Sequence, residues 1–437
     1  MLCIHQKHCK LALRTVAAAA FTLQVYSAGV AHAADTVGAA PLVAQAQPAA
    51  PPAAPAPPAA WADTIAVTGY IEGGITGNPD GPTNGLNFGH LYTDRSNSPL
   101  LNQLALSVAR PLDPKATDYD LGFTLTGMFG TDARYTHFDG EFDRARRSQY
   151  QFGILEADVL AHLPWLTDGG IDAKLGQFPS PMSAESINPT TNPLYSHSYI
   201  FNFGVTVAHT GLWTTTHVNP LLDLYLGIDT GNQTTLGSGD NNGAVAGLGG
   251  IGLNLMGGNL TIIGLSHFGP ENPNGAHENF NVNSEYRWIN DITATFKVND
   301  ALTLITDLNY IRDDGFNAQA WGIAQYATYA INDQISLQAR GEFYRDPQGF
   351  FVAAFPGPLD AVNGLEGRPN NAISGGNATY GEITLGLNYK PPVPSMFTGV
   401  VLRPEIRYDG ALNHAHPFNS GTSGHQVTLA GDIIIPF

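Results

Sequence analysis

The residues in this sequence with the clearest chemical potential are acids and bases that recur at every second position of strand-like segments. Arg403, Glu405 and Arg407 alternate with uncharged residues in 400–409, and Arg340 and Glu342 do so in 334–345. Successive side chains of a β-strand point to opposite faces, so each of these sets shares one face. Charges gathered on one face can attract ions of the opposite sign, or they can pair across neighbouring strands.

The same alternation in the other segments defines a wider set of inward-facing candidates, in which acids outnumber bases about two to one. We select the following residues, together with Glu185 from a connecting segment, as candidate lining residues: Glu156, Asp158, Lys174, Arg287, Asp291, Asp307, Arg340, Glu342, Glu382, Arg403, Glu405, Arg407 and Asp432. A wall of mainly one sign concentrates counter-ions, which predicts a preference for cations. The alternative is that the acids pair with neighbouring arginines and leave little net field.

Catalytic and metal-binding patterns are weak in this sequence. Ser266 precedes His267 directly, and His209 precedes Thr210 directly, so the two members of each pair point to opposite faces of a strand. His414 and His416 could hold a metal, but neither a carboxylate nor a cysteine lies nearby in the sequence. We therefore expect no enzyme activity, no cofactor and no metal site.

The elements that would position the charged residues are short alternating segments. We predict sixteen strands, with an uncertainty of two either way, at 65–76, 102–110, 118–130, 150–161, 171–178, 207–217, 221–230, 245–255, 259–268, 284–298, 301–312, 319–331, 334–345, 378–389, 400–409 and 425–437. Short connections rich in Asn, Asp and Gly, such as 299–300 and 332–333, alternate with long ones such as 179–206 and 346–377. This alternation is typical of a transmembrane antiparallel β-barrel with short periplasmic turns and long extracellular loops.

The last segment, 425–437, fits a barrel that has no open edge. Leu429, Ile433 and Phe437 fall on an apolar face, while Thr428 and Asp432 fall on the other. A strand like this at an open edge would invite aggregation, whereas a barrel pairs its last strand with its first. A soluble sandwich or propeller would need a charged outer surface, but only 13% of the residues are charged. Mean hydropathy is −0.08, and no apolar run long enough for a membrane-spanning helix follows the N-terminal region.

The N-terminal region predicts export. Lys7, Lys10 and Arg14 precede an Ala-rich apolar run, and Ala31-His32-Ala33 fits a cleavage site, so residues 1–33 read as a signal peptide cut after Ala33. Cleavage would remove both cysteines and change the formal charge from −17 to −20, because three basic and no acidic residues leave. That charge argues against nucleic acid as a partner. Residues 34–63 form a Pro/Ala-rich linker, and 64–437 form the barrel.

One stretch resembles a known family. Within 171–213, Lys174-Leu175-Gly176-Gln177-Phe178, Glu185, Asn188-Pro189, Asn192, Tyr195-Ser196, Ser198-Tyr199, Phe201 and His209-Thr210-Gly211 resemble the OmpL-like outer-membrane porin family. The sequence departs from that pattern at Ser183-Ala184-Glu185, where Gly-Tyr-Glu is expected. The resemblance implies a pore-forming barrel in the outer membrane of a Gram-negative bacterium. It also implies that loop 179–206 folds into the lumen and narrows it; the alternative is an external loop packed on the rim.

These observations leave two functions open. The first is a porin for ion transport and passive diffusion of small hydrophilic solutes, with a cation preference. The second is a structural or adhesion barrel with an occluded lumen, whose external loops bind a partner. Expected contacts are outer-membrane lipid and lipopolysaccharide, and a homo-oligomer is possible. A cluster of basic residues in the second long loop could face an acidic wall across the mouth, bind lipopolysaccharide phosphates or simply be solvated: Arg134, Arg144, Arg146 and Arg147.

Overall fold

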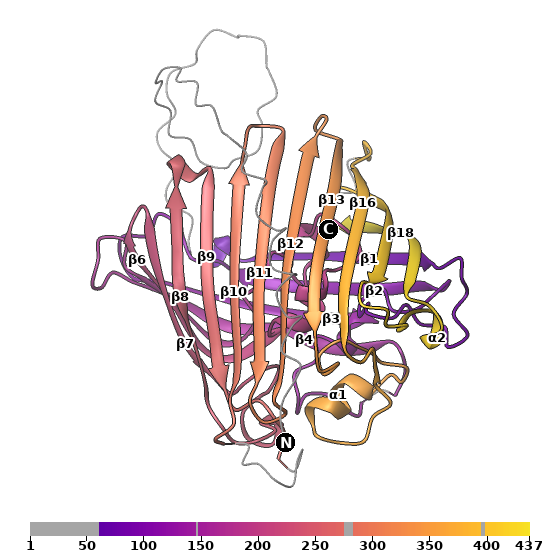
Figure 1. Ribbon diagram of the computed structural model, residues 1–437. Helices are drawn as coiled ribbons and strands as arrows, with labels where there is room; N and C mark the ends of the chain where they lie inside the picture. The colour runs from indigo at the N-terminus through magenta and orange to yellow at the C-terminus, as the bar shows by residue number, and fades with distance from the viewer. Residues whose placement is uncertain (1–60, 146, 275–282, 395–397) are drawn as a thin grey trace, which may run out of the picture. The chain divides into compact units, whose positions relative to one another are not determined.

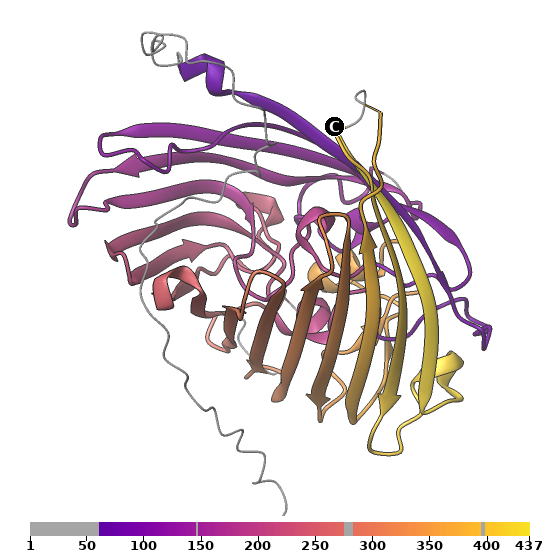
Figure 2. The same ribbon diagram turned by 90° about the horizontal axis from the view of Figure 1, so that it is seen from above.

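Sixteen strands form a closed antiparallel barrel (Figures 1 and 2). The computed structural model describes residues 61–145, 147–274, 283–394 and 398–437. The predicted signal peptide, its predicted cleavage site and the predicted linker up to residue 60 lie outside these ranges. Fold class and strand number agree with the prediction from the sequence, which is thereby confirmed.

Every barrel strand pairs with its neighbours in the chain, and β1 and β18 close the ring. The first eight strands are β1 Ala66–Gly77, β2 Pro99–Arg110, β3 Asp120–Gly130, β4 Gln151–Leu163, β5 Ile171–Pro179, β6 Ala208–Asn219, β7 Leu222–Asp229 and β8 Ala246–Leu255. The remaining eight are β9 Leu260–Gly269, β10 Arg287–Lys297, β11 Leu302–Asp313, β12 Ala318–Ala330, β13 Ile335–Asp346, β16 Ala378–Tyr389, β17 Val401–Ala411 and β18 His425–Pro436.

Helices are few and short. They are η1 Trp61–Thr64, η2 Asp132–Arg134, η3 Pro189–Thr191, the π-helix η4 Ile200–Gly204, η5 Gly237–Gly239, η6 Met256–Gly258, α1 Asp360–Leu365 and α2 Phe418–Gly421. In the same segment as α1, β14 Ala353–Ala354 pairs with β15 Ile373–Ser374, a small sheet that the sequence did not predict. Among the described residues, no helix has the length and apolar character needed to cross a bilayer.

Connections of different length gather at opposite ends of the barrel. Tight connections such as 220–221 and 331–334 define the short-turn end. Segments 78–98, 180–207 and 347–377 define the long-loop end. Because antiparallel strands reverse direction at each connection, successive connections lie at opposite ends of the barrel. The connection 314–317 between β11 and β12 is an exception in length, since it is short but lies at the long-loop end.

The barrel wall is apolar outside and polar inside. In β18, Leu429 and Ile433 are 54% and 40% exposed, while Thr428 and Asp432 are buried. The buried set includes many charged side chains, among them Arg340 and Arg407, which are the largest fully buried ones. A soluble protein buries its apolar side chains and exposes its polar ones, so the distribution here is reversed. A barrel surrounded by lipid requires this distribution.

Closure of the ring is continued beyond β18 by the last residue. Phe437 donates its N–H to the Gly69 carbonyl at 2.8 Å and accepts from the Gly69 N–H at 2.9 Å. A Cβ atom on Gly69 would lie 2.5 Å from both the Phe437 ring and the Ala105 carbonyl oxygen. The terminal aromatic ring therefore occupies the space that a side chain at position 69 would need.

We predict that Gly69→Ala impairs closure of the barrel. The added methyl group meets backbone that cannot move freely, and overpacking of this kind costs about 1–3 kcal/mol. The expected result is a smaller fraction of compact, heat-modifiable protein on unboiled gels after refolding. Gly341→Ala in β13 is the matched control, since a Cβ there meets only the Glu382 carbonyl oxygen at 4.0 Å. Equal yields of folded protein from the two variants would contradict this account of closure.

Candidate functional site

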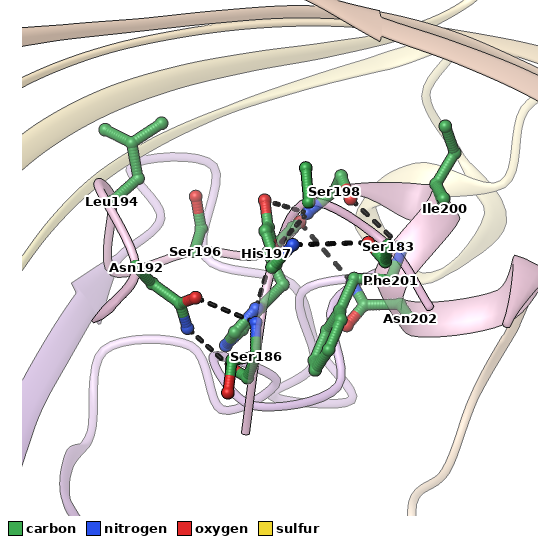
Figure 3. A network of polar contacts seen from close by, with 12 residues as sticks. Ser183, Ser186, Asn192, Leu194, Ser196, His197, Ser198, Ile200, Phe201 and Asn202 are labelled. Carbon is green, nitrogen blue, oxygen red and sulfur yellow. Dashed lines mark hydrogen bonds and ion pairs between the residues drawn. The ribbon is translucent and has the colours of Figure 1, made fainter. Parts of the chain in front are cut away.

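The site candidate is the segment 180–207, which joins β5 to β6 and is called the crossing loop here. Its side chains are mostly buried, although it belongs to no barrel strand: Met182, Leu194, Tyr199 and Ile200 are at most 3% exposed. Two hydrogen bonds link Asn192 to Ser186 within the loop: the Asn192 side chain accepts from the Ser186 N–H and donates to the Ser186 carbonyl (Figure 3). The loop is therefore a folded unit with its own internal bonds.

Aromatic packing holds the C-terminal half of the crossing loop against strands from the far part of the chain. The Tyr199 ring stacks on Tyr380 of β16, with centroids 4.9 Å apart, and on Tyr344 of β13 at 6.1 Å. Beside it, a Cβ atom on Gly322 of β12 would lie 2.6 Å from Ile200 Cγ1. Gly322 thus provides the space in which Ile200 approaches the wall.

Carboxylates of the wall accept hydrogen bonds from backbone N–H groups of the crossing loop. Glu342 accepts from Tyr199 and Ile200 at 2.7 and 2.8 Å. Glu405 accepts from Tyr195 and Ser196 at 2.8 and 3.1 Å. Buried backbone N–H groups need an acceptor, so each of these two carboxyl groups anchors one turn of the loop.

A third anchor lies at the start of the crossing loop. Asp291 accepts from the Ser183 N–H at 2.9 Å, and Asp307 accepts from the Ala184 N–H at 2.9 Å and from Ser183 Oγ at 3.0 Å. Ser183 has φ +78°, in the left-handed region that favours glycine. This explains why a glycine suits this position, and Ser183 keeps the turn by adding its side-chain bond to Asp307.

Arginines of the wall satisfy the carbonyl groups of the crossing loop. Arg403 Nη1 donates to the Pro189, Asn192 and Leu194 carbonyls at 2.9–3.1 Å. Arg340 donates to the Ser196 carbonyl at 2.7 Å, and Arg407 to that of His197 at 2.6 Å. Buried arginines are costly unless all their donors are used, and here the loop backbone uses several of them.

Glu185 is the acid of the crossing loop, and its partners come from both the wall and the loop. It accepts from Arg340 Nη1 at 2.8 Å, from Tyr326 Oη at 2.9 Å and from the Ser198 N–H, and it pairs with His197 at 2.6 Å. Burial by itself would raise the pKa of Glu185, but Arg340, His197 and Tyr326 outweigh it and lower the pKa to about 2.

The candidate residues taken from the sequence separate into four groups. Those that touch the crossing loop or belong to it are Glu185, Asp291, Asp307, Arg340, Glu342, Arg403, Glu405 and Arg407. Glu382 and Asp432 do not contact the loop but bind Arg340 and Arg403. Glu156, Asp158 and Lys174 form a separate cluster on β4 and β5, and Arg287 pairs with Asp313.

Sequence reasoning missed Asp409, which continues the alternation of Arg403, Glu405 and Arg407 by one step. Asp409 accepts hydrogen bonds from Arg407 and from Tyr199 Oη, the latter at 3.0 Å. It also pairs with His90 at 3.1 Å. Extending the period-two pattern of β17 by two residues would have found it.

A second buried loop, 78–98, was also missed. Leu86, Phe88 and Tyr92 are at most 4% exposed, and the Tyr92 ring lies 4.7 Å from that of His197. Its Asp94 pairs with Arg134 at 2.9 Å, so Arg134 is buried and is not available to lipopolysaccharide or solvent, two of the three alternatives that the sequence left open. The apolar residues within this polar, Gly-rich segment are the feature of the sequence that could have predicted its burial.

We predict that acid weakens the anchoring of the crossing loop through Glu185. Its folded pKa of about 2 lies below the unfolded value of roughly 4.3, so its contribution is present above pH 4.3 and is lost as the pH falls towards 2. The shift corresponds to about 3 kcal/mol. As the pH is lowered from 4.5 to 2.5, the midpoint temperature of heat modification of the wild type should decrease. Glu185→Gln should already be destabilised at pH 7 and should change less with pH.

Asp223→Asn is the control for this measurement, because Asp223 bonds to His217 and Asn254 and not to the crossing loop. If the midpoint temperature of the wild type changed with pH no more than that of Glu185→Gln, this result would contradict the assigned role of Glu185.

Comparisons with known proteins agree with this architecture. The structure is similar to the outer membrane channel DcaP of Acinetobacter baumannii, with TM-score 0.52, 14% identity, and 85% of this chain and 97% of that chain covered. It is also similar to an anion-selective porin from Comamonas acidovorans, with TM-score 0.52, 11% identity, and 85% and 99% covered. OprB of Pseudomonas putida at high pH gives TM-score 0.50 and 14% identity, with 86% and 94% covered. At these identities the likeness concerns the fold alone.

A search of curated proteins finds no matching sequence. A family model described as "Putative beta-barrel porin-2, OmpL-like" matches residues 64–437, which is most of the chain. The family and the fold together support an outer-membrane channel. The chain belongs to the OmpL-like β-barrel porin-2 family.

Proposed function

We propose that this protein lets small hydrophilic solutes diffuse passively across the outer membrane, through a lumen narrowed by loop 179–206. The observation that carries this proposal is the set of bonds between the crossing loop and the wall. Glu342, Glu405 and the Asp291–Asp307 pair accept from loop N–H groups, while Arg340, Arg403 and Arg407 donate to loop carbonyls. A loop held in this way is a fixed obstacle, which suits a size filter better than a moving gate.

The lumen is proposed to prefer cations, and the support comes from the wall of β3 to β7. Side chains of Asp172, Asp223 and Glu156 are 39%, 17% and 20% exposed there, against 29% for Lys174. These acids are partly exposed although Glu156 pairs with Lys174, whereas Glu382 and Asp432 on the far wall are buried against Arg340 and Arg403. The field that a passing ion meets would therefore come mainly from the β3–β7 wall.

A specific observation favours the alternative function, a structural or adhesion barrel with an occluded lumen. Loop 78–98 is buried beside the crossing loop, with Phe88, His90 and Tyr92 at most 4% exposed. Two buried loops leave less open cross-section than one. Conductance separates the two functions directly.

The remaining parts of the proposal concern export and surroundings. Residues 1–33 would direct export and be removed after Ala33, and 34–63 would serve as a linker to the barrel of 64–437. The exposed apolar belt, with Leu429 and Ile433 as examples, would contact outer-membrane lipid. Exposed basic loop residues such as Arg147 would meet lipopolysaccharide, and a homo-oligomer is compatible with this surface. No catalysis is proposed, since Ser266 and His267 are adjacent residues of β9 and so face opposite ways.

We predict stable, cation-selective single-channel steps when the refolded protein is inserted in a planar bilayer under a KCl gradient. Low salt should be used because ionic screening weakens the wall potential. The double variant Glu156→Gln, Asp223→Asn should move the reversal potential towards zero, since it removes two part-exposed acids. Glu366→Gln is the control, because Glu366 pairs with Arg144 and Arg368 in long loops. Anion selectivity in the wild type would refute the charge argument, and absence of conductance from folded protein would favour the occluded barrel.

We also predict that Glu405→Ala loosens the constriction. The variant removes the acceptor of the Tyr195 and Ser196 N–H groups, and hydrogen bonds to charged groups contribute about 1.5–3 kcal/mol each. Conductance should rise and become noisier, while heat modification shows that the barrel still forms. Asp223→Asn should leave the noise unchanged. Unaltered conductance in a folded Glu405→Ala barrel would count against the crossing loop as the constriction.

A further inference from the structure

A cluster of metal-ligand side chains lies at the long-loop end of the barrel, outside the network of the crossing loop's anchors. His209 of β6, Asp229 of β7 and His267 of β9 are all buried, and potential ligand atoms of the three lie within 4.8 Å of one another. Asp229 pairs in register with Gly211 and Ala246. The glycine leaves room for the carboxylate side chain, because a Cβ atom at Gly211 would lie 2.8 Å from the Asp229 Cβ.

The carboxylate of Asp229 lies between the two imidazoles and uses one oxygen for each. His209 Nδ1 is 2.8 Å from Oδ2, and His267 Nε2 is 3.2 Å from Oδ1. Oδ1 also accepts the Gly231 N–H at 2.8 Å. Two imidazole nitrogens and a carboxylate are a donor set used by zinc, with nitrogen ligands that calcium and magnesium do not favour.

The outward nitrogen of each imidazole faces an oxygen. His209 Nε2 is 3.0 Å from Ser180 Oγ. His267 Nδ1 is 3.7 Å from Glu271 Oε1, and neither of these two atoms has a hydrogen-bond partner among the described residues, although both side chains are buried. In metal sites a histidine ligand donates the N–H of its other ring nitrogen to such an oxygen, which fixes the ring and its tautomer.

A neutral His267 has too few N–H groups for the two carboxyl groups that it faces. A neutral imidazole has one N–H, so it can donate to Asp229 or to Glu271 but not to both. In either case a nitrogen lone pair points at a carboxylate oxygen. A second proton on the ring would remove the conflict, and so would a cation between His267 Nε2 and Asp229, with the N–H of Nδ1 turned to Glu271.

Charge in this region also calls for a cation. Asp229 and Glu271 bring two buried carboxyl groups into the cluster, and the neighbouring Arg287 is engaged by Asp313 at 2.8 Å. Buried charges need a partner, because the low-dielectric interior penalises them otherwise.

We propose that His209 Nδ1, His267 Nε2 and Asp229 bind one zinc-class divalent transition metal, while Ser180 and Glu271 orient the two histidines. The bound ion ties β6, β7 and β9 together at the point where their long loops begin. This site is independent of the proposed porin function, and it departs from our expectation from the sequence that no metal binds. Its ligands come from three strands, so no local motif reveals it.

A hydrolytic triad is the competing interpretation of part of this cluster, because Ser180, His209 and Asp229 are connected in the order that a triad requires. Two observations weigh against a hydrolytic triad. His209 is fully buried, so a substrate has no approach to the imidazole. The Ser180 hydroxyl accepts the Met182 N–H at 3.3 Å, which engages the oxygen that would have to attack. Ser180→Ala separates the interpretations, since it removes the nucleophile and leaves all three ligands.

The test is a zinc titration of the full chain after refolding in the presence of a chelator and its removal. We expect one tightly bound zinc per barrel, no comparable binding of magnesium or calcium, and a higher midpoint of heat modification with zinc. X-ray absorption at the zinc edge should show nitrogen and oxygen ligands at about 2.0–2.1 Å. His209→Ala and the size-conserving His267→Gln should each weaken binding at least tenfold, and Ser180→Ala should retain it.

The matched control is His217→Ala at the opposite end of β6. His217 bonds to Asp172 and Asp223 in a similar pattern, but its side chain and that of Asp172 are 37% and 39% exposed. Zinc binding that survives His209→Ala and His267→Gln but not His217→Ala would overturn the proposal, as would no binding by folded wild type. Labelling of Ser180 by a fluorophosphonate would establish the triad instead. The absorption spectrum needs only the wild type, so a variant that fails to fold leaves the test intact.

Discussion

Lipid cannot hydrogen-bond to a peptide backbone, and the rest of this structure depends on that constraint. Each strand must find partners on both sides, so the sheet closes on itself between β1 and β18. The last residue takes part in closure, because Phe437 and Gly69 exchange two backbone hydrogen bonds. Apolar side chains such as Leu429 then face outward, and the polar residues that alternate with them have no place except the interior.

The polar side chains that are buried between the wall and the crossing loop have to find their partners within the protein. The wall does this by pairing acids with arginines, as in Arg340 with Glu382, and by aiming the remaining groups at the crossing loop. The loop in turn presents backbone N–H groups to Glu342 and Glu405 and carbonyls to Arg403. Wall and loop are therefore each incomplete alone, because each supplies hydrogen-bond partners for buried polar groups of the other.

The same requirement acts at the rim. His209 of β6, Asp229 of β7 and His267 of β9 lie together there, and the absence of a side chain at Gly211 leaves room for Asp229. The crossing loop begins here as well, through Ser180. A metal ion at this cluster and the carboxylate anchors deeper in the loop would then use one principle, in which buried charge fixes irregular backbone to a regular wall.

The sequence by itself determined the barrel. Strict alternation, as in Gln426 to Phe437, is a local property of a strand, and turn residues such as Asn299 and Asn332 mark the connections independently of distant contacts. It also identified most residues that hold the crossing loop, because inward charges can be read from the period of two. What it could not give were the partners: that Glu185 meets Arg340, that Asp409 meets His90, or that loop 78–98 is buried. Those contacts join residues more than a hundred positions apart, and they depend on the curvature and register of the closed ring. Only the tertiary structure decides them.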